Sequence, residues 1–274
     1  MIEKLGIIDF RNIIRAIREF FGIDFSDYAL TSFKRRLERV IQLYNLNGAN
    51  ELIIKLKDEP DFFEIFLKDI SVEDTEMFRD PTMWRELREI VIPKFFTKPE
   101  FRIWMPSVTT GEEVFSLAII LREMGIQDDT KVIVTSLSKL NLETVKAGLY
   151  DMKKMEMNLA NYKRAKTNSQ LNDYFEVVNN KAQLDVTLLK NFEFVHHNLL
   201  EDKPPARIKM IIYRNKIIYF NLPLQNRILD IMYNGLMPGG IFVIGVKESI
   251  ENFITDRKFI LINDVENIHK KALV

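Results

Sequence analysis

From residue 101 onward, short apolar runs alternate with helical patterns, and this alternation constrains the fold more than any other feature of the chain. The runs are FRIWM (101–105), KVIVTSL (131–137), FEFVHH (192–197), IKMIIYR (208–214), GGIFVIG (239–245) and FILIND (259–264). Their richness in Val, Ile and Phe is typical of buried strands. Helical spacing of apolar residues predicts helices over 112–124, 140–147 and 224–236. Strands that alternate with helices indicate a mostly parallel sheet covered on both faces.

The chain ahead of these runs has a different texture and is predicted to be almost entirely helical. Four helices are expected from the spacing of its apolar residues, and the first of them ends at Gly22. The sequence therefore predicts a small all-helical domain over residues 1–92 and an α/β domain over residues 93–274. Within the second domain, the stretch 151–190 is polar and weakly patterned, and we interpret it as an insertion or a long connection.

The composition argues against several classes of protein. The 39 Lys and Arg residues balance 39 Asp and Glu residues, so no global field draws the chain to nucleic acid or to an anionic membrane. Cysteine is absent, which excludes disulfides, and the three histidines are placed so that no histidine-rich metal site is expected. No apolar run reaches the ~18 residues of a membrane span, and the start MIEKLGIIDF lacks the apolar region of a signal peptide. We therefore expect a cytoplasmic protein without membrane insertion.

The segment RIWMPSVTTGEEVFS (102–116) joins an apolar run to a helix through a turn with one glycine, Gly111. Strand, turn and helix open a parallel α/β unit, in which ligands bind at the carboxyl end of the strand. Glu112 and Glu113 fall in the first turn of the helix, where the helix dipole stabilises them and where they can face a cationic ligand. A phosphate site would need further glycines and a lysine in this turn. The alternative is an acidic helix start that serves only as a cap.

Several other short motifs accompany this segment in a fixed order along the chain. They are T-x-x-F-R (Thr75, Phe78, Arg79), T-G-E-E-x-F-S (Thr110 to Ser116), A-x-x-Y (Ala147, Tyr150), N-L-L (Asn198 to Leu200), R-N-x-x-I-Y-F (Arg214 to Phe220) and P-G-G…G-x-x-E-S (Pro238 to Ser249). Together they resemble the chemotaxis receptor methyltransferase (CheR) family over roughly residues 10 to 250. Members of this family transfer a methyl group from S-adenosylmethionine to glutamate side chains and release S-adenosylhomocysteine.

The resemblance implies a Rossmann-like methyltransferase domain preceded by a small helical domain for receptor recognition. It also implies S-adenosylmethionine as the cofactor, with Glu112 or Glu113 facing its methionyl ammonium and with Asn198 and Leu199 lining its adenine and ribose. Asn215 would border the reacting centre. The cofactor-binding residues that follow from the resemblance are Thr75, Arg79, Glu112, Glu113, Ser136, Asn198, Leu199 and Asn215.

Arg79 and Tyr219 are the catalytic residues that the resemblance implies. An acceptor glutamate, with a reference pKa of about 4.3, is already a nucleophile near pH 7, so the enzyme needs positioning and desolvation more than a general base. Arg79 would hold the acceptor carboxylate through paired hydrogen bonds, and Tyr219 would shape the pocket beside the sulfonium. The alternatives are a salt bridge of Arg79 with Asp80 or Glu76, and simple core packing for Tyr219.

The chain departs from the family pattern after the second predicted strand. It carries serines, Ser136 and Ser138, where the family has an acidic pair whose first carboxylate accepts hydrogen bonds from the ribose. Since a charged hydrogen bond contributes about 1.5–3 kcal/mol, the change would weaken cofactor affinity about tenfold to a hundredfold. Lys216 also replaces an apolar residue. A catalytically weakened or inactive relative, acting as a receptor-binding or scaffolding module, is therefore the alternative function.

A basic stripe in the helical domain is the candidate for partner binding. It consists of Lys34, Arg35, Arg36 and Arg39. Receptor helices that carry several glutamates are negatively charged, so this stripe would contact the cytoplasmic domain of a chemoreceptor and speed the encounter. The alternative is an ordinary solvated helix face.

Overall fold

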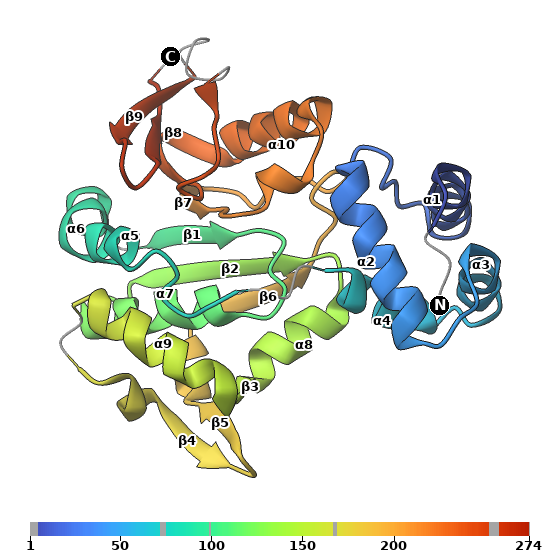
Figure 1. The fold of residues 1–274 in the computed structure, drawn as a ribbon. Helices are drawn as coiled ribbons and strands as arrows, with labels where there is room; N and C mark the ends of the chain where they lie inside the picture. The colour runs from blue at the N-terminus through green and yellow to red at the C-terminus, as the bar shows by residue number, and fades with distance from the viewer. Residues whose placement is uncertain (1–4, 72–74, 99, 167–168, 252–257, 274) are drawn as a thin grey trace. The chain divides into compact units, whose positions relative to one another are not determined.

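The computed structural model describes residues 5–71, 75–98, 100–166, 169–251 and 258–273 of the chain. These residues form two compact units (Figure 1). The helical unit comprises Met1–Val72 together with Lys216–Ile228, and the α/β unit comprises Glu73–Asn215 together with Leu229–Val274. No helix among the described residues combines the length and the apolar character that a bilayer crossing requires.

The helical unit consists of four helices around an aromatic and aliphatic core. They are α1 (Ile7–Phe21), α2 (Leu30–Leu43), α3 (Ala49–Asp58) and α4 (Phe62–Ile70). The first ends where expected, because Gly22 adopts the left-handed conformation with φ of 71°. Phe10 and Phe33 pack edge to face in the core, with ring centroids 6.1 Å apart. The prediction of four helices is confirmed.

A segment from the far end of the chain completes this unit. The backbone of Tyr28 pairs with that of Phe220, and Ala29 N donates to Tyr219 O at 2.8 Å. Asn221 N donates to Asp27 O at 2.9 Å. The second half of the R-N-x-x-I-Y-F motif therefore folds with the helical unit, which no local pattern in the sequence indicates.

The α/β unit is built on a seven-stranded sheet in the order β6-β2-β1-β7-β8-β10-β9. The strands are β1 (Phe101–Met105), β2 (Thr130–Ser136), β6 (Phe192–His196), β7 (Ile208–Ile212), β8 (Leu236–Val243), β9 (Phe259–Asn263) and β10 (Ile268–Lys271). The first five strands in this order run parallel, and β10 pairs antiparallel with both neighbours. All six predicted strands are confirmed. The seventh, β10, was missed because IHKK is short and mostly polar.

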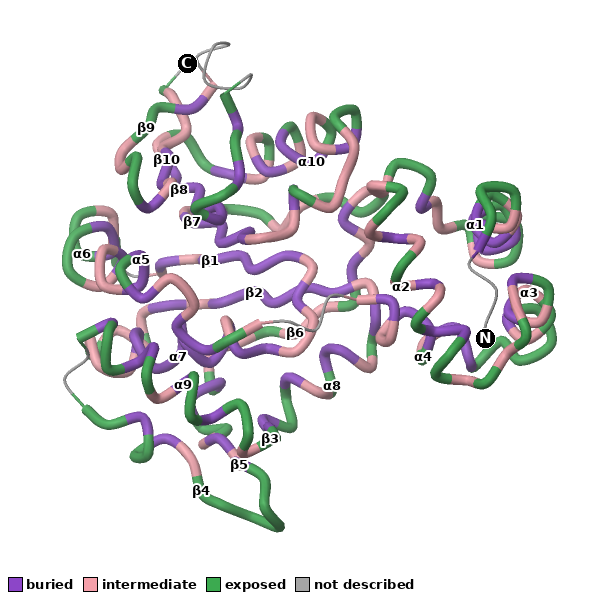
Figure 2. Tube along the Cα trace, in the orientation of Figure 1, coloured by how far each residue is buried: buried purple, intermediate pink, exposed green. Residues whose placement is uncertain are grey.

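The three helices predicted for this part of the chain are present, and buried residues of the first two form one core with the sheet. The three predicted helices correspond to α7 (Glu112–Glu123), α8 (Lys139–Ala147) and α10 (Leu222–Gly235). Figure 2 shows that β1, β2 and α7 are buried along most of their length. Burial of α7 on nearly every face explains its run of apolar residues, because a helix enclosed on all sides has no polar stripe.

Residues 73–92 belong to the α/β unit, so the domain boundary predicted at residues 92 and 93 differs from the division in the structure. This segment contains α5 (Pro81–Glu86) and η1 (Leu87–Val91), and α6 (Ile92–Phe95) follows it. Trp84 and Leu87 are fully buried in the same core as the strands. A helical pattern shows that a segment has an apolar face but not which core that face joins, and this explains the difference.

The stretch 151–190 has regular structure of its own. It contains α9 (Met152–Arg164), β4 (Phe175–Val178) and β5 (Lys181–Leu184). The two strands join β3 (Leu149–Asp151) in a small antiparallel sheet of order β3-β5-β4. The strands have three or four residues each, and β4 is exposed along most of its length. Such short, half-solvated strands leave little apolar pattern in a sequence.

Candidate functional site

Four segments with candidate site residues follow the carboxyl ends of the parallel strands β1, β2, β6 and β7. Because carboxyl ends of parallel strands meet at one edge of a sheet, these segments lie along the same edge. The turn after β1 requires its glycine. Gly111 has φ of 92°, and a Cβ there would lie 2.8 Å from the Val145 side chain and 3.0 Å from the Tyr150 hydroxyl.

Glu112 is the most deeply buried carboxylate of this edge, with 1% of its side chain exposed. Its Oε2 accepts hydrogen bonds from the hydroxyls of Thr75 and Thr110, whose oxygens lie 2.8 Å apart. Its Oε1 is buried and has no hydrogen-bond partner among the described residues. The nearest cation, Lys154 Nζ, lies 3.6 Å from Oε1. The predicted residues Thr75 and Glu112 are thus brought together, and one carboxylate oxygen remains available to a donor.

Tyr150, from the A-x-x-Y motif, contacts the turn that carries Glu112. Its hydroxyl donates to Thr110 O at 2.9 Å. Burial, together with the charge of Glu112, raises the pKa of Tyr150 well above its ordinary value, so the hydroxyl stays protonated and remains a donor. Tyr150 therefore fixes the backbone of the turn that carries Glu112.

Glu113 has a different environment from its neighbour. Its Oε1 lies 2.8 Å from Arg214 Nη1, while Arg214 Nη2 lies 2.6 Å from Asp80 Oδ2 and 3.2 Å from Arg79 O. The Arg214 side chain is 1% exposed, so this is a buried network that ties three motifs together. Of the two predicted carboxylates, Glu112 is the one with a fully buried oxygen that lacks a hydrogen-bond partner in the described chain. Arg214 itself was not predicted as a site residue, although its position in the R-N motif offered a signal.

The T-x-x-F-R segment is held in place through its backbone. Phe78 N donates to Ser116 Oγ at 2.8 Å, and Met77 N donates to Asn158 Oδ1 at 3.0 Å. Phe78 and Asp80 have positive φ values of 54° and 56°, which are unusual for residues other than glycine. Arg79, between them, is half-buried, and its carbonyl accepts hydrogen bonds from Arg214 and Trp84. Asp80, the suggested salt-bridge partner of Arg79, pairs with Arg214.

Ser136 and Ser138, which the resemblance places at the positions of an acidic pair, have different environments. Ser136 is the last residue of β2 and is buried at the strand end. Ser138 is the N-cap of α8, where its hydroxyl accepts a hydrogen bond from Asn141 N at 3.3 Å. Because serine and aspartate are comparable N-caps, the change at position 138 costs little. Of the two replacements, only the one at Ser136 changes a group at the carboxyl edge of the sheet.

Asn198 and Leu199 follow β6, the strand next to β2. The register pairs Ser136 with His196. Asn198 and Leu199 follow His196 by two and three residues, so they come directly after the strand end that lies beside Ser136. Asn198 Oδ1 accepts from Leu200 N at 3.1 Å and shapes the turn, while Leu199 is buried. The structure therefore places Ser136, Asn198 and Leu199 at neighbouring strand ends.

Asn215 follows β7 and meets the glycine motif after β8. Its φ is 57°, and its backbone N donates to Glu248 Oε2 at 2.8 Å. The same oxygen accepts from Gly245 N at 2.7 Å. A Cβ at Gly245 would lie 2.7 Å from Asn215 Oδ1, so this glycine permits the close approach of the two segments.

Tyr219 belongs to the helical unit and is described with it. The Arg36 guanidinium lies 4.7 Å from the centre of the Tyr219 ring, a cation–π arrangement. Burial lowers the pKa of Arg36, which still remains charged near neutral pH. Tyr219 thus packs against the predicted basic stripe, and sequence reasoning did not anticipate that the two features share one unit.

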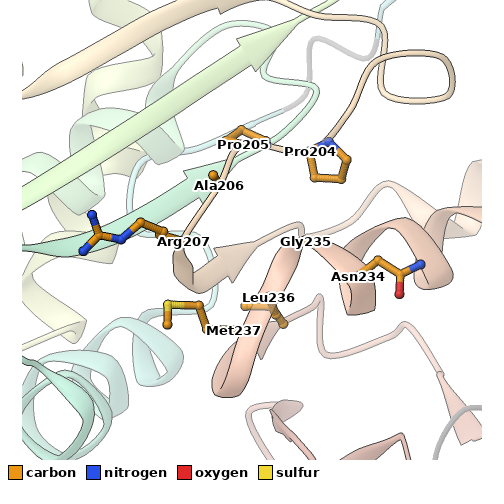
Figure 3. Close-up of a pocket in the computed structure, with 8 residues that line it drawn as sticks. All are labelled: Pro204, Pro205, Ala206, Arg207, Asn234, Gly235, Leu236 and Met237. Carbon is orange, nitrogen blue, oxygen red and sulfur yellow. The ribbon is translucent and has the colours of Figure 1, made fainter.

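A shallow pocket of about 260 Å³ lies elsewhere in the α/β unit. It is lined by Pro204, Pro205, Ala206, Arg207, Asn234, Gly235, Leu236 and Met237 (Figure 3). These residues precede β7 and begin β8, so the pocket lies at the amino ends of these strands, at the edge opposite to the predicted site. None of the predicted site residues lines it.

Comparison with known families accounts for both units. The family model for the SAM binding domain of CheR methyltransferases matches residues 73–264, and the model for the all-alpha CheR domain matches residues 8–71. The chain belongs to the CheR methyltransferase family. The predicted family and fold class are confirmed, and the matched domain makes this chain a methyltransferase with S-adenosylmethionine as its cofactor.

Individual relatives are similar over most of their length. Cher3 of Pseudomonas putida, which is named provisionally as a methyltransferase, is 31% identical over 91% of both chains. A chemotaxis protein methyltransferase of Listeria monocytogenes is 24% identical over 89% of this chain and 91% of its own. Among solved structures, the N-methyltransferase NodS of Bradyrhizobium japonicum has a TM-score of 0.39 at 11% identity, covering 72% of this chain and 87% of its own.

The buried cluster of this CheR protein fits the methionyl end of the cofactor. An α-ammonium is a strong donor, and Glu112 Oε1 is a buried acceptor without a hydrogen bond among the described residues. A buried carboxylate needs a close cation, and Lys154 lies 3.6 Å away, so an arriving ammonium at hydrogen-bond distance would stabilise it further.

Proposed function

We propose that this CheR protein methylates glutamate side chains on the cytoplasmic domain of a chemoreceptor. The observation that carries the proposal is the buried Glu112 carboxylate, with one oxygen held by two threonines and the other without a hydrogen bond in the described chain. Relatives that match most of this chain are named chemotaxis protein methyltransferases. We further propose that the protein is cytoplasmic, that the helical unit serves receptor recognition, and that the α/β unit serves methyl transfer.

We assign the cofactor to residues at the carboxyl edge of the sheet. Glu112, supported by Thr75, would hold the methionyl ammonium, and Glu113 would position Arg214 and with it the turn. Ser136, Asn198 and Leu199 would hold the ribose and adenine, and Asn215 would border the sulfonium. When bound, S-adenosylmethionine supplies an electrophilic methyl group on a positively charged sulfur.

The acceptor glutamate requires orientation and exclusion of water from the protein, and no general base. A glutamate carboxylate near pH 7 is ionised and needs no base, so the residues must orient it and exclude water. Arg79 would orient it through the bidentate geometry that guanidinium offers to carboxylates. Tyr219 is the second catalytic residue that we propose, as the resemblance implies, and its ring carries the Arg36 guanidinium at 4.7 Å.

The residues of the basic stripe differ in the contacts that they make. Arg36 Nη1 donates to Ile70 O and Arg39 Nη2 donates to Asp69 O, each at 3.3 Å, so both bind the carboxyl end of α4. Cations are favourable at that end of a helix. Lys34 Nζ lies 3.9 Å from Glu38 Oε1, so Lys34 is paired as well. We therefore propose that Arg35, which is exposed, makes the largest contribution of the stripe to binding an acidic receptor helix.

Transfer of a tritiated methyl group tests the proposal. The full chain would be incubated with labelled S-adenosylmethionine and the cytoplasmic fragment of a chemoreceptor from the same organism. We expect label in the receptor that alkali releases as methanol, because carboxyl methyl esters hydrolyse in base. A folded protein that gives no label with any chemoreceptor of the organism would contradict the proposed substrate.

A catalytically weakened or inactive receptor-binding module is the second candidate, favoured by Ser136. The variant Ser136→Asp separates the two. If the chain is an active enzyme with a weakened cofactor site, the variant will bind S-adenosylhomocysteine about tenfold to a hundredfold more tightly, since a charged hydrogen bond to the ribose is worth about 1.5–3 kcal/mol. Ser138→Asp is the matched control and should leave affinity unchanged, because Ser138 caps α8. No detectable binding in wild type or variant would favour the inactive module.

A further inference from the structure

Among the described residues, Lys154 is the cation nearest to the buried Oε1 of Glu112. Its Nζ lies 3.6 Å from Glu112 Oε1, beyond hydrogen-bond distance but within ion-pair distance. No motif of the sequence singles Lys154 out. It is the third residue of α9, within the first turn.

The two side chains of this ion pair differ greatly in their exposure to solvent. The Lys154 side chain is 45% exposed, whereas the Glu112 side chain is 1% exposed. Water can therefore solvate the Lys154 ammonium when another cation takes its place beside Glu112. Its place at a helix amino terminus also disfavours a positive charge there. Glu112, in contrast, needs a cation at every moment, because an unpaired buried carboxylate is expensive.

This asymmetry favours the exchange of one ammonium for another. The incoming group would be the α-ammonium of a ligand, which can approach within hydrogen-bond distance of Glu112 Oε1. An α-amino acid carries its carboxylate on the same carbon as its ammonium, so the two groups arrive together. A displaced Lys154 remains tethered beside the site on a flexible four-carbon stem and meets that carboxylate.

Resting on the function proposed above, we infer that Lys154 is a mobile counter-ion that pairs with Glu112 and then with the α-carboxylate of the bound cofactor. Lys154 would bind the carboxylate, and Glu112 the ammonium, at the methionyl end of the cofactor. The pair would thus select ligands that carry both an ammonium and a carboxylate over nucleosides that carry neither.

Calorimetric titration of the full chain tests this inference with three ligands. They are S-adenosylhomocysteine, its decarboxylated analogue that keeps the amine, and 5′-methylthioadenosine, which lacks both groups. In Lys154→Met, we expect binding of S-adenosylhomocysteine to weaken about five- to tenfold, in line with one partly exposed charged contact. Binding of the decarboxylated analogue should tighten or stay unchanged, because its ammonium no longer competes with Lys154. Binding of 5′-methylthioadenosine should stay the same and so show that the site is folded.

The neighbouring lysine supplies a matched control. Lys153 is exposed on the same turn, and its backbone N, not its side chain, bonds Asp151 Oδ1. Lys153→Met should therefore bind all three ligands like wild type. Tighter or unchanged binding of S-adenosylhomocysteine in Lys154→Met would overturn the inference and leave the proposed function intact. Absence of S-adenosylhomocysteine binding to the wild-type chain would overturn both.

Discussion

Glu112 and Glu113 are adjacent in sequence, yet replacing each by glutamine is expected to affect different properties of this CheR protein. Glutamine keeps the size of the side chain and removes only the charge. Glu112 has a buried oxygen that no group of the described chain hydrogen-bonds, whereas Glu113 is paired with a buried guanidinium. The first change should reduce cofactor binding, and the second should reduce the free energy of unfolding.

The structure sets the expected magnitudes. Glu112→Gln removes one charge-assisted hydrogen bond to the cofactor ammonium, worth about 1.5–3 kcal/mol, so affinity should fall about tenfold to a hundredfold. The free energy of unfolding of this variant should stay within about 1 kcal/mol of wild type, because removing the buried charge offsets the loss of its ion pair with Lys154. Glu113→Gln weakens a buried pair whose loss costs about 3–5 kcal/mol, and Asp80, 2.6 Å from Arg214, retains part of it. We therefore expect a loss of about 2 kcal/mol, or about 5 °C in Tm.

Two assays on the same protein preparations separate the effects. Calorimetry with S-adenosylhomocysteine measures affinity, and urea unfolding followed by circular dichroism measures stability. Affinity of Glu113→Gln should be measured well below its Tm, so that unfolding does not mimic weak binding. The reasoning fails if Glu112→Gln binds like wild type, or if the two variants lose similar amounts of stability.

Two further predictions concern stability. Burial lowers the pKa of His269 from its reference value of 6.5 to about 4, against the opposing effect of Asp264. The unfolded chain therefore takes up a proton first, and the free energy of unfolding should fall by at most about 3 kcal/mol between pH 6.5 and pH 4. His269→Gln should flatten this part of the urea-unfolding profile, and an unchanged slope would count against the assignment. Gly111→Ala should lower the free energy of unfolding by more than 1 kcal/mol, since it combines a φ of 92° with contacts at 2.8 Å; a Tm equal to that of wild type would refute it.

Local patterns in the sequence were sufficient for most of the fold. Period and composition identified four helices of the helical unit and six strands of the main sheet, because each presents an apolar face to a core. They missed β10, whose four residues are largely polar, and the small sheet of 151–190, whose strands are short and partly exposed. The motifs identified the family, and with it the cofactor, because the order of several short segments is far more specific than any one of them.

Tertiary structure decided how those segments work together. The sequence alone determined that two glutamates begin a helix after a strand, but only the arrangement of partners separates Glu112 from Glu113. The partners of each come from motifs tens of residues away, such as Thr75 for Glu112 and Arg214 for Glu113. The same holds for Lys154, which no motif marks. Electrostatic roles depend on distance and burial in space, and local patterns report neither for residues far apart along the chain.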